Sequence, residues 1–417
     1  MKKYFDFLNK SVTPYHAVEN IKAQLISNGF TELYEGDAWE LTEGGKYFVI
    51  KGGSSVIAFV KRGIGFMIVA SHSDFPTLAV KGEEKSGLYC KLSVEKYGGG
   101  IMYSFMDRPL GVAGRVAVST ESGASVRLVD LDGCSVVIPS VAIHMNRDVN
   151  DSCKLTAAKD MLPLASFGGR SLMKAIADRL SVSEDSIISH DLRLYNKQQA
   201  TAFGMSEEFL LSPRIDNLIS AGASLAAFLE AGTEQTPVLA VFDNEEVGSS
   251  TKQGANSTFL QDTLRRISGG EEEYLRALAS SFMVSADNAH ALHPNYPELS
   301  DRENAPVLGG GVVIKYNSNQ AYTTDAVSDA VFRAVCNKGK VKLQRFYNRA
   351  DMRGGSTLGS IANTKVSIPT VDIGLPQLAM HSAAECCAVS DIVELERAMK
   401  AFYNSTLTVR GNDITVK

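Results

Sequence analysis

The chain has 417 residues and a formal charge of −5, with 44% hydrophobic and 21% charged residues. At roughly 100 to 200 residues per domain, this length predicts two or three globular domains, and the composition excludes a disordered or fibrous chain. Lys and Arg form no block, and no apolar run approaches the roughly 18 residues that cross a bilayer, so neither nucleic acid nor a membrane is an expected partner.

Two further features of composition bear on the compartment. Asp6 stands where a signal peptide would need apolar residues, which predicts a cytoplasmic protein. The six cysteines include no pair at C-x-x-C spacing, so we expect reduced, structural cysteines and no thiolate zinc site.

The first predicted element is a helix with signals at both ends. Thr13 is suited to the N-cap and Pro14 to the first helical position, and Gly29 marks the end. Three predicted strands follow at residues 46–51, 55–62 and 66–71. The last of them is apolar throughout, as expected for a strand that is buried on both faces.

Residues 81–211 have a different residue pattern from the rest of the chain. Short Val-, Ser- and Gly-containing segments alternate with turns and predict strands at 115–119, 125–130 and 135–143. We interpret this region as an inserted β-rich domain. The run from Gly98 to Gly100 is read as a flexible turn, because no G-x-G-x-x-G pattern for a dinucleotide accompanies it.

After residue 211 strands and helices alternate. Ser212 and Pro213 predict the start of a helix with a continuous apolar side. The later expected elements are strands at 237–242, 283–286, 311–316 and 370–373 and helices at 258–267, 272–282, 324–337 and from about 390. This order predicts an α/β fold with a mixed sheet flanked by helices, in which residues 1–80 and 212–417 form one discontinuous domain.

Four polar clusters lie at or near the carboxyl ends of predicted strands, where ligands bind in open α/β sheets. They occupy residues 71–74, 243–246, 285–288 and 380–382. Each alone has an ordinary explanation, such as a solvated acidic loop or a hydrogen-bonded core histidine. Together they favour one shared crevice.

The chemistry of these clusters predicts a hydrolytic metal site. His72 and His381 with several carboxylates and no thiolate suit catalytic zinc, manganese or cobalt. Of the adjacent Glu245 and Glu246, one can bind metal while the other takes a proton from water. Asp74, two residues after His72, is placed to orient that imidazole.

Other catalytic chemistries find less support. Ser356 lies in Gly-Gly-Ser-Thr-Leu, where Leu358 replaces the second Gly of a nucleophile elbow. No phosphate-binding loop of the G-x-x-x-x-G-K-[ST] type is present. His290 and His293 form an H-x-x-H pair without the Glu of H-E-x-x-H, and we interpret them as structural.

Seven short motifs, in this order along nearly the whole chain, resemble the aspartyl aminopeptidase family of dinuclear zinc peptidases. They are His72-Ser73-Asp74-Phe75-Pro76, Met106-Asp107-Arg108-Pro109-Leu110, Ile143-His144-Met145-Asn146-Arg147, Ser212-Pro213-Arg214-Ile215-Asp216-Asn217, Asp243-Asn244-Glu245-Glu246-Val247-Gly248-Ser249, Ser285-Ala286-Asp287 and Met380-His381-Ser382. Together they are far more specific than His-Ser-Asp alone. The resemblance implies an aminopeptidase that releases N-terminal residues from peptides.

The resemblance also implies a set of metal ligands. Two zinc ions per subunit would be held, one by His72, Asp216 and Asp287 and the other by Asp216, Glu246 and His381. Asp216 is added by the resemblance alone, since the residues by themselves indicate only a charged first turn of a helix. Glu245 would be the general base of a two-zinc hydroxide mechanism, with Asp74 supporting His72.

Assembly and substrate binding are implied in the same way. The inserted domain, residues 81–211, would mediate dimerisation within a homo-oligomer, a tetrahedral dodecamer, and His144 would reach the active site of a neighbouring subunit. Lys315 and Tyr322 fall where the family binds substrate. Ala321 and Ala384 stand where arginines are common in the family, so a preference for Asp or Glu as the first residue stays open.

Two alternatives remain at this point. Another dinuclear-metal amidohydrolase, a deacylase or carboxypeptidase, would use a similar sheet and metal pair. A non-catalytic assembly protein would keep the oligomeric assembly but would have lost catalytic activity. The complete ligand set and Glu245 argue against this alternative.

Overall fold

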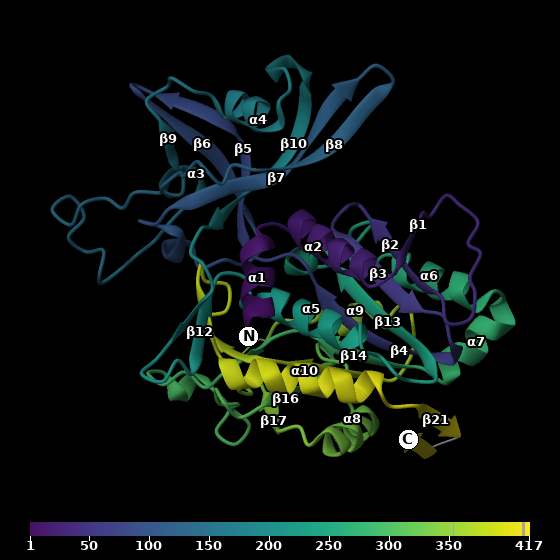
Figure 1. Ribbon diagram of the computed structural model, residues 1–417. Coiled ribbons are helices and arrows are strands. Elements are labelled where there is room, and N and C mark those ends of the chain that lie inside the picture. The colour runs from purple at the N-terminus through teal and green to yellow at the C-terminus, as the bar shows by residue number, and fades with distance from the viewer. Residues whose placement is uncertain (353, 411–412) are drawn as a thin grey trace.

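A nine-stranded mixed sheet forms the centre of the larger part of the molecule (Figure 1) in the computed structural model, which describes residues 1–352, 354–410 and 413–417. Its strands, in spatial order, are β1 (Thr31–Leu33), β2 (Lys46–Lys51), β3 (Ser55–Val60), β13 (Gln235–Phe242), β4 (Gly63–His72), β14 (Phe282–Ala286), β18 (Thr370–Gly374), β16 (Val312–Tyr316) and β17 (Leu343–Tyr347). β13, β4, β14 and β18 pair in parallel, so their carboxyl ends meet at one edge.

Helices cover both faces of this sheet. One face packs against α1 (Lys2–Lys10), α2 (Pro14–Ser27), α5 (Ile215–Phe228), α8 (Ala326–Gly339) and α10 (Val389–Tyr403). The other packs against α6 (Phe259–Ser268), α7 (Glu271–Ala279) and α9 (Leu358–Ala362). Every residue of β13 is buried, as expected for a strand covered on both sides.

A second sheet lies apart from the first, at the top of Figure 1. Its strands, in spatial order, are β8 (Gly123–Asp130), β7 (Leu110–Thr120), β10 (Ile187–Asn196), β5 (Thr77–Ser86), β6 (Tyr89–Tyr97) and β9 (Leu164–Ser166). With α3 (Ala157–Asp160) and α4 (Leu172–Leu180) near it, this sheet has a hydrophobic core of its own. β5 follows β4 after only four residues, so the second sheet is joined directly to the carboxyl edge of the first.

Smaller elements complete the fold. A third sheet has the order β11 (Thr201–Phe203), β12 (Phe209–Ser212), β20 (Glu385–Ala388), β19 (Pro376–Leu378) and β15 (Ala289–His290). The chain also forms the hairpin of β21 (Leu407–Arg410) and β22 (Asp413–Val416), and the 3-10 turns η1 (Met102–Phe105), η2 (Glu184–Ser186), η3 (Glu245–Val247) and η4 (Pro297–Leu299). The third sheet brings the segments around residues 212, 289 and 381 together.

The mixed α/β fold class agrees with the sequence prediction. The first predicted helix is α2, where the Thr13 side chain accepts a hydrogen bond from the backbone N–H of His16, as an N-cap should. β2, β3 and β4 occupy the three strand segments predicted after it.

Three predicted elements were wrong in detail. Residues 135–143 form no strand and contribute only isolated bridges at Val136 and Val137. The helix expected to end at residue 282 ends at Ala279, because Phe282 already begins β14. The helix expected to begin after Ser212 begins at Ile215 instead.

The start of α5 departs from the local signal. Ser212 ends β12, and Arg214, with a left-handed φ of 63°, is the residue before the helix. Asp216 and Asn217 lie within the helix bounds but have non-helical angles. The buried carboxylate of Glu385 accepts a hydrogen bond from the Asp216 N–H, so a contact distant in sequence overrides the predicted cap.

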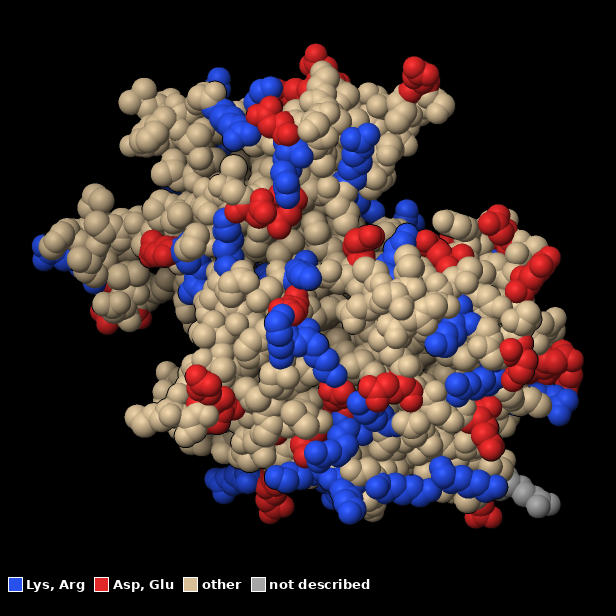
Figure 2. Space-filling model, in the orientation of Figure 1, with Lys and Arg blue, Asp and Glu red and all other residues tan. Residues whose placement is uncertain are grey.

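Charge on the visible face of the molecule is mixed. Figure 2 shows acidic and basic side chains interspersed over both parts, with Lys and Arg gathered along the lower edge of this view. In the described part of the chain, no helix combines the length and hydropathy that a membrane-spanning segment requires.

Candidate functional site

The predicted ligands lie around the edge where the parallel strands end. His72 is the last residue of β4, Asp287 follows β14, and Glu246 lies in η3 just after β13. Pairing of Phe242 with His72 places the start of the acidic turn beside β4. The parallel sheet therefore brings together residues that are up to 215 positions apart in sequence.

The other two predicted ligands come from outside this sheet. Asp216 lies in the non-helical first turn of α5, and His381 lies between β19 and β20 with a left-handed φ of 67°. Both segments adjoin the third sheet, in which Ser212 is paired with Glu385. The helix start and the loop are thereby held next to the ends of β4 and β14.

Two groups of possible ligand atoms share one residue. In one, His72 Nε2 lies 3.7 Å from Asp216 Oδ1 and 3.5 Å from Asp287 Oδ1. In the other, His381 Nε2 lies 3.5 Å from Asp216 Oδ2 and 3.4 Å from Glu246 Oε2. The ligand atoms within each group all lie within 4.8 Å of one another, and each oxygen of Asp216 faces a different group.

The chemistry of these groups fits a cation. Asp216 Oδ1 and Glu246 Oε1 are buried without a hydrogen-bond partner among the described residues. An unpaired buried carboxylate oxygen is costly unless a cation compensates it. Burial raises the pKa of Glu246 well above its usual value, and the Asp216 charge adds to the effect, against the lowering by His381. The mixed nitrogen and oxygen donors suit zinc.

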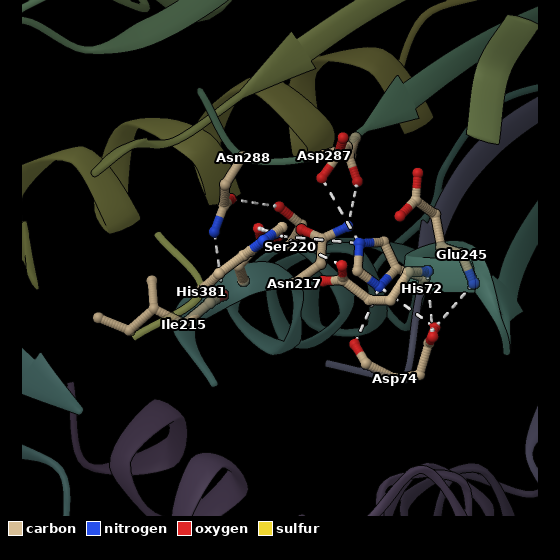
Figure 3. A network of polar contacts seen from close by, with 12 residues as sticks. His72, Asp74, Ile215, Asn217, Ser220, Glu245, Asp287, Asn288 and His381 are labelled. Carbon is tan, nitrogen blue, oxygen red and sulfur yellow. Dashed lines mark hydrogen bonds and ion pairs between the residues drawn. The ribbon is translucent and has the colours of Figure 1, made fainter. Parts of the chain in front are cut away.

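Asp74 lies on the side of His72 that faces away from Asp287 (Figure 3). Its Oδ1 lies 3.4 Å from His72 Nδ1, opposite the nitrogen that faces Asp287. The same carboxylate accepts hydrogen bonds from the backbone N–H groups of Glu245 (3.1 Å) and Glu246 (3.2 Å) and from the Tyr97 hydroxyl (2.6 Å). One buried side chain thus orients both a histidine and the acidic turn.

Glu245 stands apart from the two groups that share Asp216. It lines the cavity, and Figure 3 shows its carboxyl group beside His72 and directed away from Asp74. Burial raises the pKa of Glu245 to about 8, and the charges of Asp287 and Asp74 act in the same direction, against the lowering by His72. A carboxyl group in this position is suited to proton transfer.

The site opens into a cavity of about 310 Å³. Lys315 and Tyr322 both line it, with Lys315 Nζ 5.1 Å from the centre of the Tyr322 ring. Lys315 Nζ also lies 3.2 Å from Asp287 Oδ2, so this buried ammonium is paired with a predicted metal ligand. His290 lines the same cavity, but neither it nor His293 belongs to a metal-binding group of the described residues.

His144 lies away from these residues within its own chain. It occupies an exposed turn of the inserted region and is not among the residues that line the cavity. The fold of a single chain therefore does not bring His144 together with the other predicted site residues.

The glycine turn at residues 98–100 packs against the site and is no free linker. Gly98 has a φ of +71°, and a Cβ there would lie 3.2 Å from the Glu246 Cβ. The Gly99 carbonyl lies 3.3 Å from His381 Nδ1. The glycine run is visible in the sequence, but only the structure shows that it allows the close approach to Glu246.

Tyr97 and Glu385 also contact the site, and sequence reasoning selected neither of them. Tyr97 reaches Asp74 from β6 of the second sheet, and Glu385 reaches His381 and Asp216 from β20. Tyr97 contacts a side chain and Glu385 contacts two backbone N–H groups, and no local spacing assigns either residue this role.

Comparison with known proteins places this chain in a family. Residues 7–403 match the family described as aminopeptidase I zinc metalloprotease (M18). A protein of Clostridium acetobutylicum named "Probable M18 family aminopeptidase 2" is 44% identical over 424 residues, covering 97% of this chain and 98% of that protein.

Solved structures share the fold. A chain in the cryo-EM structure of the Ape4 and Nbr1 complex is 35% identical, with a TM-score of 0.92 over 96% of this chain and 84% of that one. The mApe1 dodecamer of S. cerevisiae is 24% identical, with a TM-score of 0.84 over 96% of this chain and 95% of that one. The chain described here belongs to the M18 family of zinc aminopeptidases.

Proposed function

We propose that this aminopeptidase uses two zinc ions per subunit, one held by His72, Asp216 and Asp287 and the other by Asp216, Glu246 and His381. The observation that carries the proposal is the position of Asp216, whose two oxygens face different histidines. When bound, a zinc pair supplies Lewis-acid activation of water and of the substrate carbonyl. Manganese or cobalt would suit the same donors, and metal analysis of the purified protein decides among them.

In this proposal the chain's own residues move the proton and hold the ligands. Glu245 takes a proton from the attacking water and delivers it to the leaving nitrogen. Asp74 keeps the His72 ring in orientation, because its carboxylate lies 3.4 Å from Nδ1. Lys315 and Tyr322 form the wall against which the first residue of the peptide binds.

Peptides with a free N-terminus should be hydrolysed, and the same peptides carrying an N-acetyl group should be resistant. The physical reason is that the free amine of the substrate is a donor to the metal pair, and acetylation removes it. Release of the first residue from matched peptides, followed by mass spectrometry, measures this. Comparable cleavage of the acetylated form, or release from the carboxyl end, would favour the deacylase or carboxypeptidase alternative.

We propose that the enzyme accepts a broad range of first residues, which includes Asp and Glu. Lys315 is the one Lys or Arg among the described lining residues, and it is already paired with Asp287. Ala321 and Ala384 supply no charge to attract a substrate carboxylate. A panel of aminoacyl substrates tests the proposal, and activity confined to Asp and Glu would contradict it.

We further propose a cytoplasmic homo-oligomer, a dodecamer like the mApe1 structure, in which residues 81–211 form a dimerisation domain. The separate core of the second sheet supports an independently folded insert. His144 would then reach a neighbouring active site, which its exposed position permits. Sedimentation measures the size of the oligomer, and a monomer would contradict the proposed assembly. Cell fractionation measures the compartment, and a membrane-bound protein would contradict the cytoplasmic location.

His144→Phe should assemble and bind zinc but turn over poorly. Mixed oligomers of His144→Phe and Glu245→Gln should regain activity, because a subunit with intact Glu245 then meets an intact His144 from its neighbour. Each variant mixed with itself is the control and should stay inactive. Verified mixed oligomers without recovered activity would show that His144 does not act across subunits.

A further inference from the structure

Glu385 is a buried carboxylate that contacts two predicted metal ligands through their backbones. It is the first residue of β20, and its side chain is 2% exposed. Oε1 accepts a hydrogen bond from the N–H of His381 at 2.7 Å, and Oε2 accepts one from the N–H of Asp216 at 2.9 Å. One side chain thereby connects a loop and a helix start that are 165 positions apart in sequence.

Both ligands have backbone conformations that need outside support. His381 has a φ of 67°, in the left-handed region that is uncommon for residues other than glycine. Asp216 has a φ of −82° and a ψ of 111°, so the first turn of α5 is not helical there. The hydrogen bonds that the Glu385 carboxyl oxygens accept from the two N–H groups stabilise these conformations.

The sheet around Glu385 fixes the position of its carboxylate. Glu385 is paired with Ser212 in β12, which leads into α5, and β20 is also paired with β19, which leads into the His381 loop. Gln377 Nε2 lies 3.4 Å from Oε1 on the β19 side. Both segments that carry the ligands are therefore anchored to the strand that carries Glu385.

We propose that Glu385 is a positioning residue that sets Asp216 and His381 at the spacing required by the second metal group, the one completed by Glu246. The proposal rests on the two-zinc function proposed above. Glu385 contacts Asp216 and His381 through their backbone N–H groups and not through their ligand atoms, and it does not line the cavity. Its effect is on metal binding through geometry, because supporting partners of this kind orient the ligands they contact.

Replacement of Glu385 by Gln tests this. Gln has the same shape but presents an NH₂ group to one of the two N–H donors, so one hydrogen bond is replaced by a repulsive contact. We expect the second zinc to bind about 10- to 100-fold more weakly, with a smaller loss for the first, because His381 belongs to the second group only. Competitive titration with a zinc chelator gives both dissociation constants, and the visible spectrum of the cobalt-loaded protein reports changes in metal coordination.

Asp391 offers a matched control. It is also a buried carboxylate, and it accepts hydrogen bonds from the N–H groups of Gly309 (2.7 Å) and Gly311 (2.9 Å), neither of which is a predicted ligand. Asp391→Asn should lower the melting temperature of the metal-free protein much as Glu385→Gln does, but should leave both zinc dissociation constants within about twofold. A loss confined to Glu385→Gln separates positioning from general stability.

The outcomes are distinguishable. If wild-type protein binds fewer than two zinc ions per chain, the two-zinc function fails. If it binds two and Glu385→Gln binds both with wild-type affinity, only the role of Glu385 fails.

A second variant and a measurement on the wild type apply if Gln prevents folding. Glu385→Asp keeps the charge but is one methylene shorter, so it cannot reach both N–H groups and should also lose the second zinc. In wild-type protein, the amides of Asp216 and His381 should exchange hydrogen as slowly as those of Gly309 and Gly311. Exchange at the rate of exposed loops would overturn the proposal.

Discussion

Glu245→Gln is expected to bind two zinc ions per chain and to lose turnover by a factor of at least about 10² to 10⁴, the usual contribution of a general acid–base group. The physical reason is that Gln keeps the shape of Glu245 but cannot accept the proton of the attacking water. Glu245 lies outside the two ligand groups that share Asp216, so metal binding should survive. Turnover number and zinc content of the same preparation measure both parts of the prediction.

A matched control is Glu272→Gln, because Glu272 is exposed on α7 and far from the ligand groups in the fold. This variant should keep wild-type turnover. Near-normal turnover in Glu245→Gln would remove Glu245 from the mechanism. Loss of zinc from Glu245→Gln would instead assign it to the ligands, in line with the third possible group, which joins it to His72 and Glu246.

Asp216→Ala is expected to empty or disorder both metal sites, whereas Asp287→Ala should chiefly weaken one. The reason is geometric: each oxygen of Asp216 faces a different histidine, while of the two histidines only His72 lies near Asp287. Zinc per chain after dialysis should therefore fall toward zero for Asp216→Ala and toward one for Asp287→Ala. Asp216→Ala should be inactive because it lacks both metals.

Folding must be checked in both variants, because Asp287→Ala also leaves the buried Lys315 ammonium without its carboxylate partner. Circular dichroism and the size of the metal-free oligomer provide that check. Two zinc ions per chain bound to a folded Asp216→Ala protein would show that Asp216 does not bridge the sites.

Local signals predicted the helices and strands that depend on neighbouring residues. Thr13 and Pro14 predict the start of α2, and the structure has the cap hydrogen bond at that position. The apolar run at 66–71 predicts a strand buried on both faces, which is β4. These predictions succeed because a helix cap depends on contacts within a few residues, and an apolar run depends only on burial of the strand.

The same kind of signal failed where a distant contact competes with it. Ser212 and Pro213 have the sequence of a helix start, but Ser212 is drawn into β12 by pairing with Glu385. Asp216 is then held in a non-helical conformation by a carboxylate that is 169 positions away. No local window contains both partners, so the displacement could not be predicted from it.

For this protein, the sequence by itself determined the α/β class, the polar clusters at strand ends and the residue types suited to zinc. Motif resemblance added Asp216 and the division of ligands, which stay predictions until metal binding is measured. Only the tertiary structure decided that the two oxygens of Asp216 face different histidines, that Gly98 admits the close approach of Glu246, and that Glu385 links two ligand segments. The physical reason is that these contacts depend on how parallel strands and the third sheet bring remote backbone segments together, and such pairing is a property of the whole fold.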